Sequence, residues 1–244
     1  MARERIDLLL VKRGLAPGRE RARALILAGK VVCDDQVVEK AGARIDEGAE
    51  IRLKGNDIPF VGRGGLKLEA ALNAFAADPA GRVCIDIGAS TGGFTDCLLQ
   101  RGAKKVYAVD VGYGQLAWSL RNDARVVVRE RTNIRSCTRT DFPDPLEFAV
   151  IDLSFISLAK VLPVVFALLE PESPVVALVK PQFEVGKGEV GKGGIVRDEG
   201  KRRAALAEVR EFASGCGFAA CGEIESPITG QKGNIEYLLH LVRR

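Results

Sequence analysis

The stretch CIDIGASTGGFTDCLL, residues 84–99, decides the fold class of this chain. Its first part is apolar apart from Asp86 and is typical of a buried strand, and its last part has the pattern of a helix that begins near Phe94. Between them, glycines at positions 88, 92 and 93 predict a turn at which the backbone approaches a ligand closely, beside the free N–H groups of a helix start. The glycines follow the order G-x-x-x-G-G, which is not the dinucleotide-binding order G-x-G-x-x-G.

A second carboxylate follows at the end of the next apolar stretch, YAVDVG, where Asp110 closes the strand. A carboxylate in this place can accept hydrogen bonds from the two hydroxyl groups of a cofactor ribose. The alternative is a purely structural turn in which Asp110 caps a helix. Together, the acidic-x-G-x-x-x-G turn and Asp110 resemble the S-adenosylmethionine-dependent methyltransferases. That resemblance implies cofactor contacts from the following set: Asp86, Gly88, Ala89, Ser90, Gly92, Gly93, Phe94, Asp110 and Asp152.

Apolar strands alternate with helical segments from about residue 66 onward. Such alternation is typical of an α/β fold with a mostly parallel sheet covered on both faces, here a Rossmann-like methyltransferase domain. Residues 1–60 have a different pattern, because two short amphipathic helices, ended by Gly14 and Gly29, precede short β-rich segments. We therefore expect a small α+β domain over residues 1–60 and the α/β domain over residues 61–244.

Four charged residues are predicted to meet at one edge of the sheet. Asp152 closes the strand FAVID, and Lys180 closes VVALVK just before a proline that must end the strand. Lys67 opens the first helix of the α/β domain, and Glu236 begins its last strand. Each of them alone could be a solvated surface charge or a turn cap. Because ligands of such sheets bind outside the carboxyl ends of the strands, their convergence there predicts a functional site.

Composition excludes several classes of function. The only histidine is His240, which argues against Ser-His-Asp hydrolysis and most zinc sites, and we expect no metal. The six cysteines form no C-x-x-C pair, so a disulfide framework is not expected. The longest apolar region, VLPVVFALLE, is too short and too interrupted by Pro163 to span a bilayer. We expect a cytoplasmic protein without stable membrane insertion.

Longer motifs carry a resemblance to one family. RIDLLLVKRGLAPGRERARALILAGKVVCDDQVV, residues 5–38, looks like an S4 domain, a small RNA-binding module. The rest resembles the FtsJ-type ribose 2′-O-methyltransferases, and the combination resembles the TlyA (haemolysin A) family of rRNA cytidine-2′-O-methyltransferases. The specific matches are DIGASTGGFTD, VKPQFEVGKGEVGKGGIVRDE and SPITGQKGNIEYLL. Two departures are CDDQ, where the S4 hairpin usually has Asn-Gly or Asp-Gly, and the absence of a serine before Arg63.

The resemblance implies S-adenosylmethionine as cofactor, ribosomal RNA or a ribosomal subunit as partner, and a catalytic tetrad of Lys67, Asp152, Lys180 and Glu236. Lysine is ordinarily protonated at neutral pH, so two roles for Lys180 remain open. It could act as a neutral general base or as a cation that stabilises the developing alkoxide.

Basic residues mark the predicted RNA contacts. Residues 1–30 contain eight Lys or Arg against three Asp or Glu, a charge excess that indicates a phosphate-bearing partner or a solvated helix face. The candidates are Arg5, Arg19, Arg23 and Lys30 in the S4-like unit, and Lys187 and Lys192 in the glycine-rich loop after Lys180.

Three rival functions deserve weight. The first is a methyltransferase acting on a base or a small molecule, which the tetrad and the RNA module disfavour. The second is a non-catalytic RNA-binding or ribosome-assembly factor, which the complete cofactor turn disfavours. The third is a haemolysin-like membrane-active protein, which no apolar segment supports.

Overall fold

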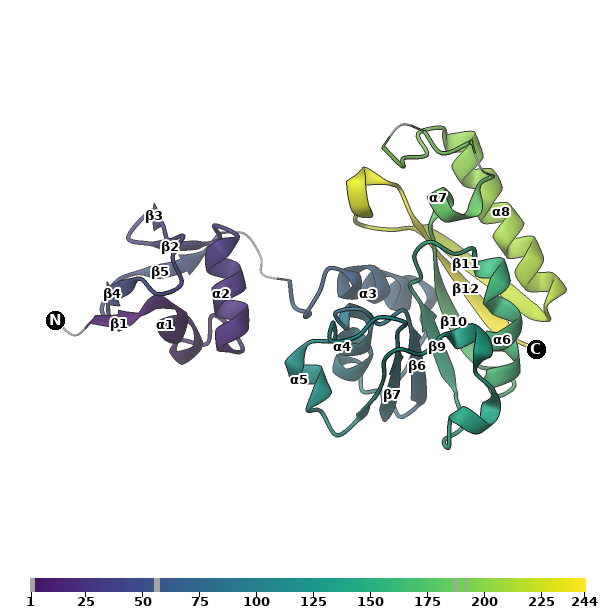
Figure 1. Cartoon of the computed structure of the whole chain (residues 1–244), viewed down its shortest axis with the longest axis horizontal. Coiled ribbons are helices and arrows are strands. Elements are labelled where there is room, and N and C mark those ends of the chain that lie inside the picture. Colours follow the sequence, from purple (N-terminus) through teal and green to yellow (C-terminus); the bar gives the residue numbers. More distant parts are fainter. Residues whose placement is uncertain (1–2, 55–57, 187, 192) are drawn as a thin grey trace. The chain divides into compact units, whose positions relative to one another are not determined.

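A computed structural model describes residues 3–54, 58–186, 188–191 and 193–244 of the chain. The structure divides into two compact units, Met1–Asp57 and Ile58–Arg244 (Figure 1). Each unit has its own hydrophobic core, so each is described by itself.

The first unit packs two helices against short antiparallel strands. Ile6, Leu9 and Leu10 of the first helix and Leu25 and Ile26 of the second are buried in one core. The predicted helix ends at Gly14 and Gly29 are correct, since both glycines have the positive φ of a helix C-terminus. The elements are β1 (Arg3–Arg5), α1 (Ile6–Lys12), α2 (Arg19–Leu27), β2 (Val31–Cys33), β3 (Gln36–Val37), β4 (Arg44–Asp46) and β5 (Ile51–Leu53).

The strands of the first unit form two small sheets. β1 pairs with β4, and β2 lies between β3 and β5, all antiparallel. Asp34 and Asp35 connect β2 to β3 with φ values of 46° and 63°. A two-residue hairpin of this kind requires positive φ at both central residues, and aspartate tolerates that conformation better than most residues. CDDQ therefore forms the tight hairpin despite lacking the usual glycine.

The second unit is built on a seven-stranded sheet with the order β11-β12-β10-β9-β6-β7-β8. The five strands from β10 to β8 pair in parallel, and β12 runs antiparallel to both of its neighbours. This arrangement confirms the expected α/β fold with a mostly parallel sheet. The strands are β6 (Val83–Ile87), β7 (Lys105–Val109), β8 (Val126–Arg129), β9 (Phe148–Ile151), β10 (Pro174–Val179), β11 (Phe218–Glu225) and β12 (Tyr237–Arg243).

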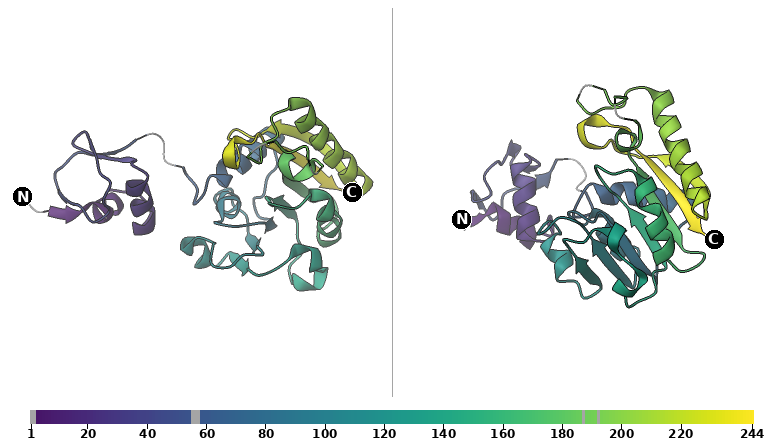
Figure 2. Two further views of the ribbon diagram at one scale, coloured as in Figure 1. Left: turned by 45° about the horizontal axis from the view of Figure 1, so that its top comes forward. Right: turned by 45° about the vertical axis from the view of Figure 1, so that its right-hand side comes forward.

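Helices cover both faces of this sheet (Figure 2). One core contains residues of α6 and α8 with alternate strand residues, and the other contains residues of α3 and α4 with the strand residues between them. The helices are α3 (Gly64–Phe75), α4 (Gly93–Gln100), α5 (Trp118–Arg121), α6 (Leu162–Leu168), α7 (Pro181–Glu184) and α8 (Glu199–Gly215). Four short 3₁₀ turns are η1 (Ile134–Ser136), η2 (Arg139–Asp141), η3 (Leu158–Lys160) and η4 (Gln231–Gly233).

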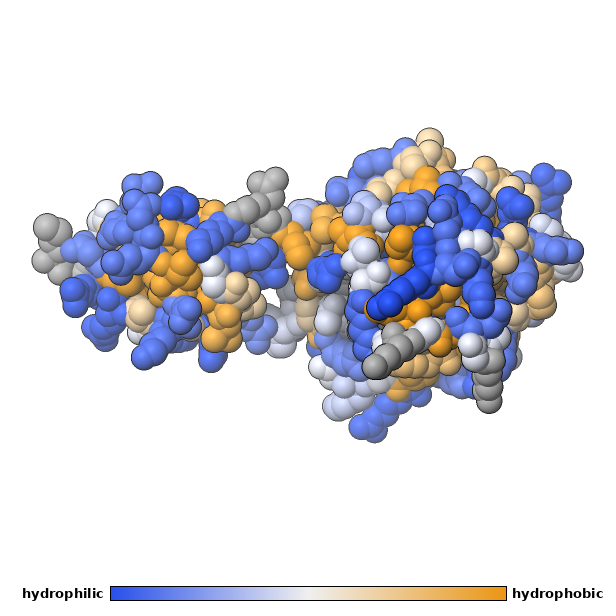
Figure 3. Space-filling view, turned by 90° about the horizontal axis from the view of Figure 1, so that it is seen from above, coloured by the Kyte–Doolittle hydropathy of each residue, from blue (hydrophilic) through white to orange (hydrophobic). Residues whose placement is uncertain are grey.

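Strand β11 lacks the apolar sequence pattern of the other strands of the sheet. Only Phe218 at its start is fully buried, and most of the following side chains are partly or fully exposed, because β11 is an edge strand. An edge strand with one solvated face lacks the continuous apolar pattern by which the central strands were recognised. Figure 3 shows hydrophilic and apolar side chains interspersed on the face that it presents.

The sheet topology decides where a ligand can bind. From β6 the chain continues to β7 on one side, whereas β9 lies on the other side. The strand order thus reverses at β6, and the loops after β6 and β9 diverge to opposite faces of the sheet. In open α/β sheets the crevice at such a reversal, outside the carboxyl ends of the strands, is the usual ligand site.

Candidate active site

The glycine turn after β6 brings two loops into direct contact. Gly88 has a φ of +90°, and a Cβ atom added to it would lie 2.3 Å from the backbone oxygen of Asp152. Only glycine fits this conformation and this approach. The loop after β6 and the loop after β9 therefore close on each other at the reversal of strand order.

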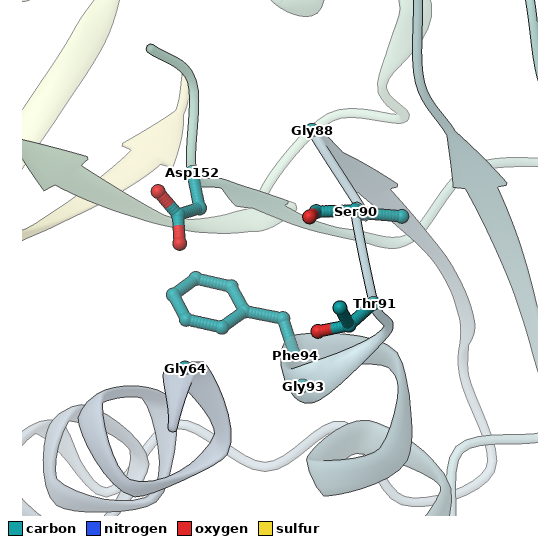
Figure 4. A pocket seen from close by; sticks show the side chains of 8 residues that line it. Gly64, Gly88, Ser90, Thr91, Gly93, Phe94 and Asp152 are labelled. Atoms are coloured by element: carbon teal, nitrogen blue, oxygen red, sulfur yellow. The ribbon is translucent and has the colours of Figure 1, made fainter. Parts of the chain in front are cut away.

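A pocket opens at this contact (Figure 4). The Asp152 carboxylate points toward the Phe94 ring and the start of α3, where a Cβ atom on Gly64 would lie 3.9 Å from Asp152 Oδ2. The lining combines three glycines with small polar side chains, a surface that a ligand can approach at backbone distance. The lining residues are Gly64, Gly88, Ala89, Ser90, Thr91, Gly93, Phe94 and Asp152.

Six of the nine residues proposed from the sequence to contact the cofactor line this pocket: Gly88, Ala89, Ser90, Gly93, Phe94 and Asp152. Gly92 does not line the pocket. It directly precedes α4 with a φ of +95°, and a Cβ atom added to it would meet Leu116 and Leu120 in the core. Gly64 and Thr91 line the pocket although the sequence reading did not select them. Gly64 belongs to α3, an element far from the glycine turn in sequence.

Asp110 lies beside the glycine turn and fixes it. Its Oδ2 accepts a hydrogen bond from the backbone N–H of Ser90 at 2.8 Å, and its Oδ1 accepts one from Gly112 at 2.6 Å. The side chain is half-buried, and each carboxylate oxygen retains a second lone pair. The carboxylate therefore joins the end of β7 to the turn after β6 and can still accept hydrogen bonds from a ligand.

Asp86 occupies a different position from the other acidic residues. Its side chain is fully buried in β6, where Oδ2 accepts a hydrogen bond from Thr95 at 2.6 Å and Oδ1 has no partner among the described residues. Burial raises the pKa of Asp86 to about 7. Asp86 binds Thr95 in the first turn of α4, the helix that begins at the glycine turn. Asp86 therefore fixes the position of that turn.

Replacing Asp86 with asparagine will flatten the pH dependence of stability. Between about pH 4 and 7 the unfolded chain has lost the Asp86 proton while the folded chain keeps it, so the free energy of unfolding falls as pH rises, by up to about 4 kcal/mol over the full range. Urea unfolding of both proteins from pH 5 to 8 measures the two slopes. Equal slopes would contradict a raised pKa at this residue.

The four charged residues of the predicted tetrad form two ion pairs. Lys180 Nζ lies 2.5 Å from Asp152 Oδ1, and Lys67 Nζ lies 2.5 Å from Glu236 Oε2. Lys67, Lys180 and Glu236 are each at least nine-tenths buried. Buried charges are tolerated when they are paired in this way, so both pairs are set features of the fold rather than flexible surface contacts.

The sheet register brings the two pairs together. Val179 of β10 pairs with Tyr237 of the antiparallel β12, so the neighbouring residues, Lys180 and Glu236, stand at adjacent positions where the two strands end and begin. On α3, Gly64 faces Asp152 and Lys67 lies three residues further, on the same side of the helix. All four charges thus lie at the edge of the sheet that carries the pocket.

Ser154 is a residue at this site that the sequence reading gave no chemical role. Lys180 Nζ donates a hydrogen bond to Ser154 Oγ at 3.0 Å, and Ser154 belongs to the same loop as Asp152. An ammonium has three N–H donors. Asp152 and Ser154 therefore fix the direction of Lys180 and leave its remaining donor for a ligand.

Gly230 leaves the space that the Glu236 carboxylate of the second pair occupies. A Cβ atom at Gly230 would lie 2.0 Å from Glu236 Oε1, and the buried carboxylate is already held by Lys67. We expect Gly230→Ala to displace Glu236 and to lower methyl transfer at least tenfold, because removing one partner of a buried ion pair is costly. Gly215→Ala is the matched control, since Gly215 is exposed, has no positive φ, and has no atom within 4 Å of its Cβ position. Equal activity of the two variants would show that Glu236 adapts.

Four of the six predicted RNA contacts belong to the first unit. In the first unit, Arg5 and Arg19 both contact the buried carboxylate of Asp7, whereas Arg23 is exposed on α2 and Lys30 follows that helix. Lys187 and Lys192 lie outside the described residues.

The described parts of the chain contain neither a candidate metal-binding cluster nor a membrane-spanning helix. No group of three or more His, Cys, Asp or Glu side chains there is arranged to hold a metal ion. None of the helices in those parts is both long enough and apolar enough to cross a lipid bilayer.

Comparison with known proteins identifies two family matches. Residues 60–243 match the FtsJ-like methyltransferase family, and residues 4–51 match the S4 domain. The 16S/23S rRNA (cytidine-2′-O)-methyltransferase TlyA of Mycobacterium tuberculosis is 50% identical over 240 residues, which cover 98% of this chain and 90% of that protein. Hemolysin A of Brachyspira hyodysenteriae is 43% identical over 239 residues, covering 98% and 99%.

A solved structure from Streptococcus thermophilus agrees with this assignment. It superposes with a TM-score of 0.78 at 48% sequence identity, and the match covers 100% of this chain and 89% of that one. These matches confirm the resemblance inferred from the motifs. The chain belongs to the FtsJ-like methyltransferase family, within the S4-bearing group that includes TlyA and Hemolysin A.

Proposed function

We propose that this protein transfers a methyl group from S-adenosylmethionine to the ribose 2′-hydroxyl of a cytidine in ribosomal RNA. The observation that carries the proposal is the set of two ion pairs, the buried Lys67–Glu236 and the partly buried Lys180–Asp152, beside a glycine-lined pocket. Support for the substrate comes from TlyA of M. tuberculosis, whose name gives this activity and which is 50% identical to this chain.

The pocket suits a nucleoside cofactor with a charged tail. Gly64, Gly88 and Gly93 line the pocket without side chains, and Asp110 provides free lone pairs for ribose hydroxyl groups. Asp152, whose Oδ2 is turned toward the pocket, can accept a hydrogen bond from the cofactor's ammonium group. When bound, the cofactor supplies an electrophilic methyl group on a sulfonium, so the protein mainly has to place the acceptor hydroxyl in line with it.

We assign Lys180 the position nearest the acceptor hydroxyl. Its Nζ forms an ion pair with Asp152 and donates a hydrogen bond to Ser154, and a further N–H donor is available to the ribose 2′-oxygen. In this arrangement the lysine fixes the oxygen and stabilises the negative charge that develops as the hydroxyl loses its proton. Lys67 and Glu236 complete the network and hold the ribose.

The pH dependence of the rate separates the two chemical roles of Lys180. If the lysine acts as a neutral base, its Nζ takes the hydroxyl proton and the rate rises tenfold per pH unit until the lysine is neutral. If it acts as a cation, the hydroxyl proton goes to water. The rate then stays constant while the lysine is protonated and falls once the lysine becomes neutral. Single-turnover methylation between pH 6 and 10 distinguishes a rising profile from a falling one.

The S4 domain is assigned to RNA binding. We propose that Arg5, Arg19, Arg23 and Lys30 contact RNA phosphates, that residues 1–60 dock the substrate, and that residues 61–244 carry out the reaction. Lys187 and Lys192 are proposed to add phosphate contacts near the methyl acceptor. From the proposed ribosomal substrate we also propose a cytoplasmic location.

A labelled-methyl transfer assay tests the proposed function. The full chain is incubated with methyl-labelled S-adenosylmethionine and ribosomal subunits, and the label is mapped to base or ribose by nuclease digestion and chromatography. Label in 2′-O-methylcytidine supports the proposal. Label in a base, or no label with any ribosomal RNA, would refute it. Leakage of dye-filled liposomes is measured in parallel, and leakage without methyl transfer would favour the haemolysin-like alternative.

A further inference from the structure

The first unit contains a buried carboxylate that does not belong to the methyltransferase site. Asp7 in the first turn of α1 has no exposed surface. Its Oδ1 accepts a hydrogen bond from Arg5 Nε at 3.0 Å, and its Oδ2 accepts one from Arg5 Nη2 and one from Arg19 Nε, both at 2.9 Å. The carboxylate is thus held by two arginines, one from β1 and one from α2.

These contacts hold two guanidinium groups close together. Since Arg5 Nη2 and Arg19 Nε touch the same oxygen, they are at most about 6 Å apart. The two arginine side chains are still 38% and 53% exposed, so their outer nitrogens face solvent. Among the described residues, neither Arg5 Nη1 nor the two terminal nitrogens of Arg19 has another hydrogen-bond partner.

Asp7 is what makes this proximity stable. Two guanidinium groups at such a distance repel each other unless a negative charge lies between them. Hydrogen bonds from Arg5, and next those from Arg19, lower the pKa of Asp7 well below its usual range despite its burial, so it stays ionised throughout the physiological pH range. The bidentate contact also fixes the plane of Arg5, which removes most of the ordering cost of a later contact.

We propose that Arg5 and Arg19 form a clamp for a single RNA phosphate and that Asp7 is its positioning residue. The two arginines and Asp7 have a net charge of +1, which balances one phosphodiester. The free nitrogens of both arginines lie within reach of one phosphate, whose oxygens can accept from two guanidinium groups at once. The inference rests on the proposed function, because it takes RNA as the ligand.

The clamp has a distinctive consequence for salt dependence. Each phosphate neutralised on a nucleic acid duplex contributes about one unit to the slope of log affinity against log salt concentration. Removing either arginine leaves Asp7 with one partner and a net charge of zero, so the phosphate contact is lost. Arg5→Gln, Arg19→Gln and the double variant will therefore each lower the slope by about one unit. Arginines that contact separate phosphates would lower it by about two units in the double variant.

The experiment measures binding of the full chain to a fluorescent ribosomal RNA transcript from 0.05 to 0.3 M KCl, with thermal unfolding of each variant as a check on the fold. Arg19→Gln retains the bidentate Arg5–Asp7 contact, so we expect it to disturb the fold least of the three variants. A slope change of about one unit in the double variant supports the clamp. A change of about two units overturns it.

Charge-conserving variants provide a second test. Lysine cannot reproduce the two parallel hydrogen bonds of Arg5, so Arg5→Lys will weaken RNA binding about tenfold although the charge is unchanged. Arg52→Lys is the matched control, because the only side-chain hydrogen bond of Arg52 among the described residues is a single exposed one to Asp35, which a lysine can also make, and it will bind as the wild type does. Wild-type affinity of Arg5→Lys would overturn the clamp. If the wild-type chain binds but does not methylate RNA, the proposed function fails while the clamp stands.

Discussion

Lys180→Ala will bind S-adenosylmethionine as the wild-type protein does and will lose methyl transfer by a factor of about 10² to 10⁴. The substitution removes the donor that we place at the ribose 2′-oxygen, while the glycine turn and Asp110 stay in place. Ser154 and Asp152 lose their contact with Nζ, so the site also loses the group around which they are arranged. Isothermal titration with the cofactor and single-turnover methylation measure the two effects separately.

Lys104→Ala is the control for this prediction, because Lys104 is an exposed lysine of the same unit. It should bind the cofactor and transfer the methyl group normally. Methyl transfer by Lys180→Ala within a factor of three of the wild type would exclude Lys180 as the residue that contacts the acceptor. Loss of cofactor binding together with activity would instead indicate that the lysine supports the pocket.

Gly88→Ala will abolish cofactor binding and lower thermal stability. The new Cβ atom would lie 2.3 Å from the backbone oxygen of Asp152, and backbone cannot rotate away as a side chain can. The residue also has a φ of +90°, which costs an L-residue roughly 1–2 kcal/mol. Either the turn or the Asp152 loop must move, and each movement opens the pocket. We expect S-adenosylmethionine affinity to fall more than a hundredfold.

Gly81→Ala is the control for Gly88→Ala, because it introduces backbone strain without a steric clash. Gly81 has a φ of +72°, but no atom lies within 4 Å of its Cβ position. This variant should lose about 1 kcal/mol of stability from the backbone conformation alone and keep its cofactor affinity. If the two variants bind the cofactor equally well, the close contact between Gly88 and Asp152 has no part in forming the site.

The comparison of predictions with the structure is most informative for the acidic residues. Asp86, Asp110 and Asp152 all close apolar strands, and the sequence reading assigned all three to the cofactor. In the structure Asp86 is buried against Thr95, and Asp110 accepts a hydrogen bond from the backbone of the glycine turn. Of the three, only Asp152 lines the pocket. A sequence pattern locates a carboxylate at the end of a strand, whereas the direction of its side chain depends on which neighbours pack around it.

The S4-like unit gives a similar result. Basic residues at the start of the chain predicted a phosphate-binding surface, and Arg5 and Arg19 were among the candidates. The pattern treated Asp7 as one of several compensating charges. Its burial, and its contacts with both arginines, follow from the packing of α1 against α2 and were not visible in the order of the residues.

The sequence by itself determined the fold class and the position of the glycine turn, and it predicted that four charged residues would meet near that turn. These follow from local patterns: apolar runs, glycine spacing, and charges where strands end. Only the tertiary structure decided which charges pair. Lys67 and Glu236 are 169 residues apart in the chain, and β12 brings them together by running opposite to its neighbours. Strand direction and register depend on the packing of the whole sheet, because a strand's own residues do not specify which strand will lie beside it.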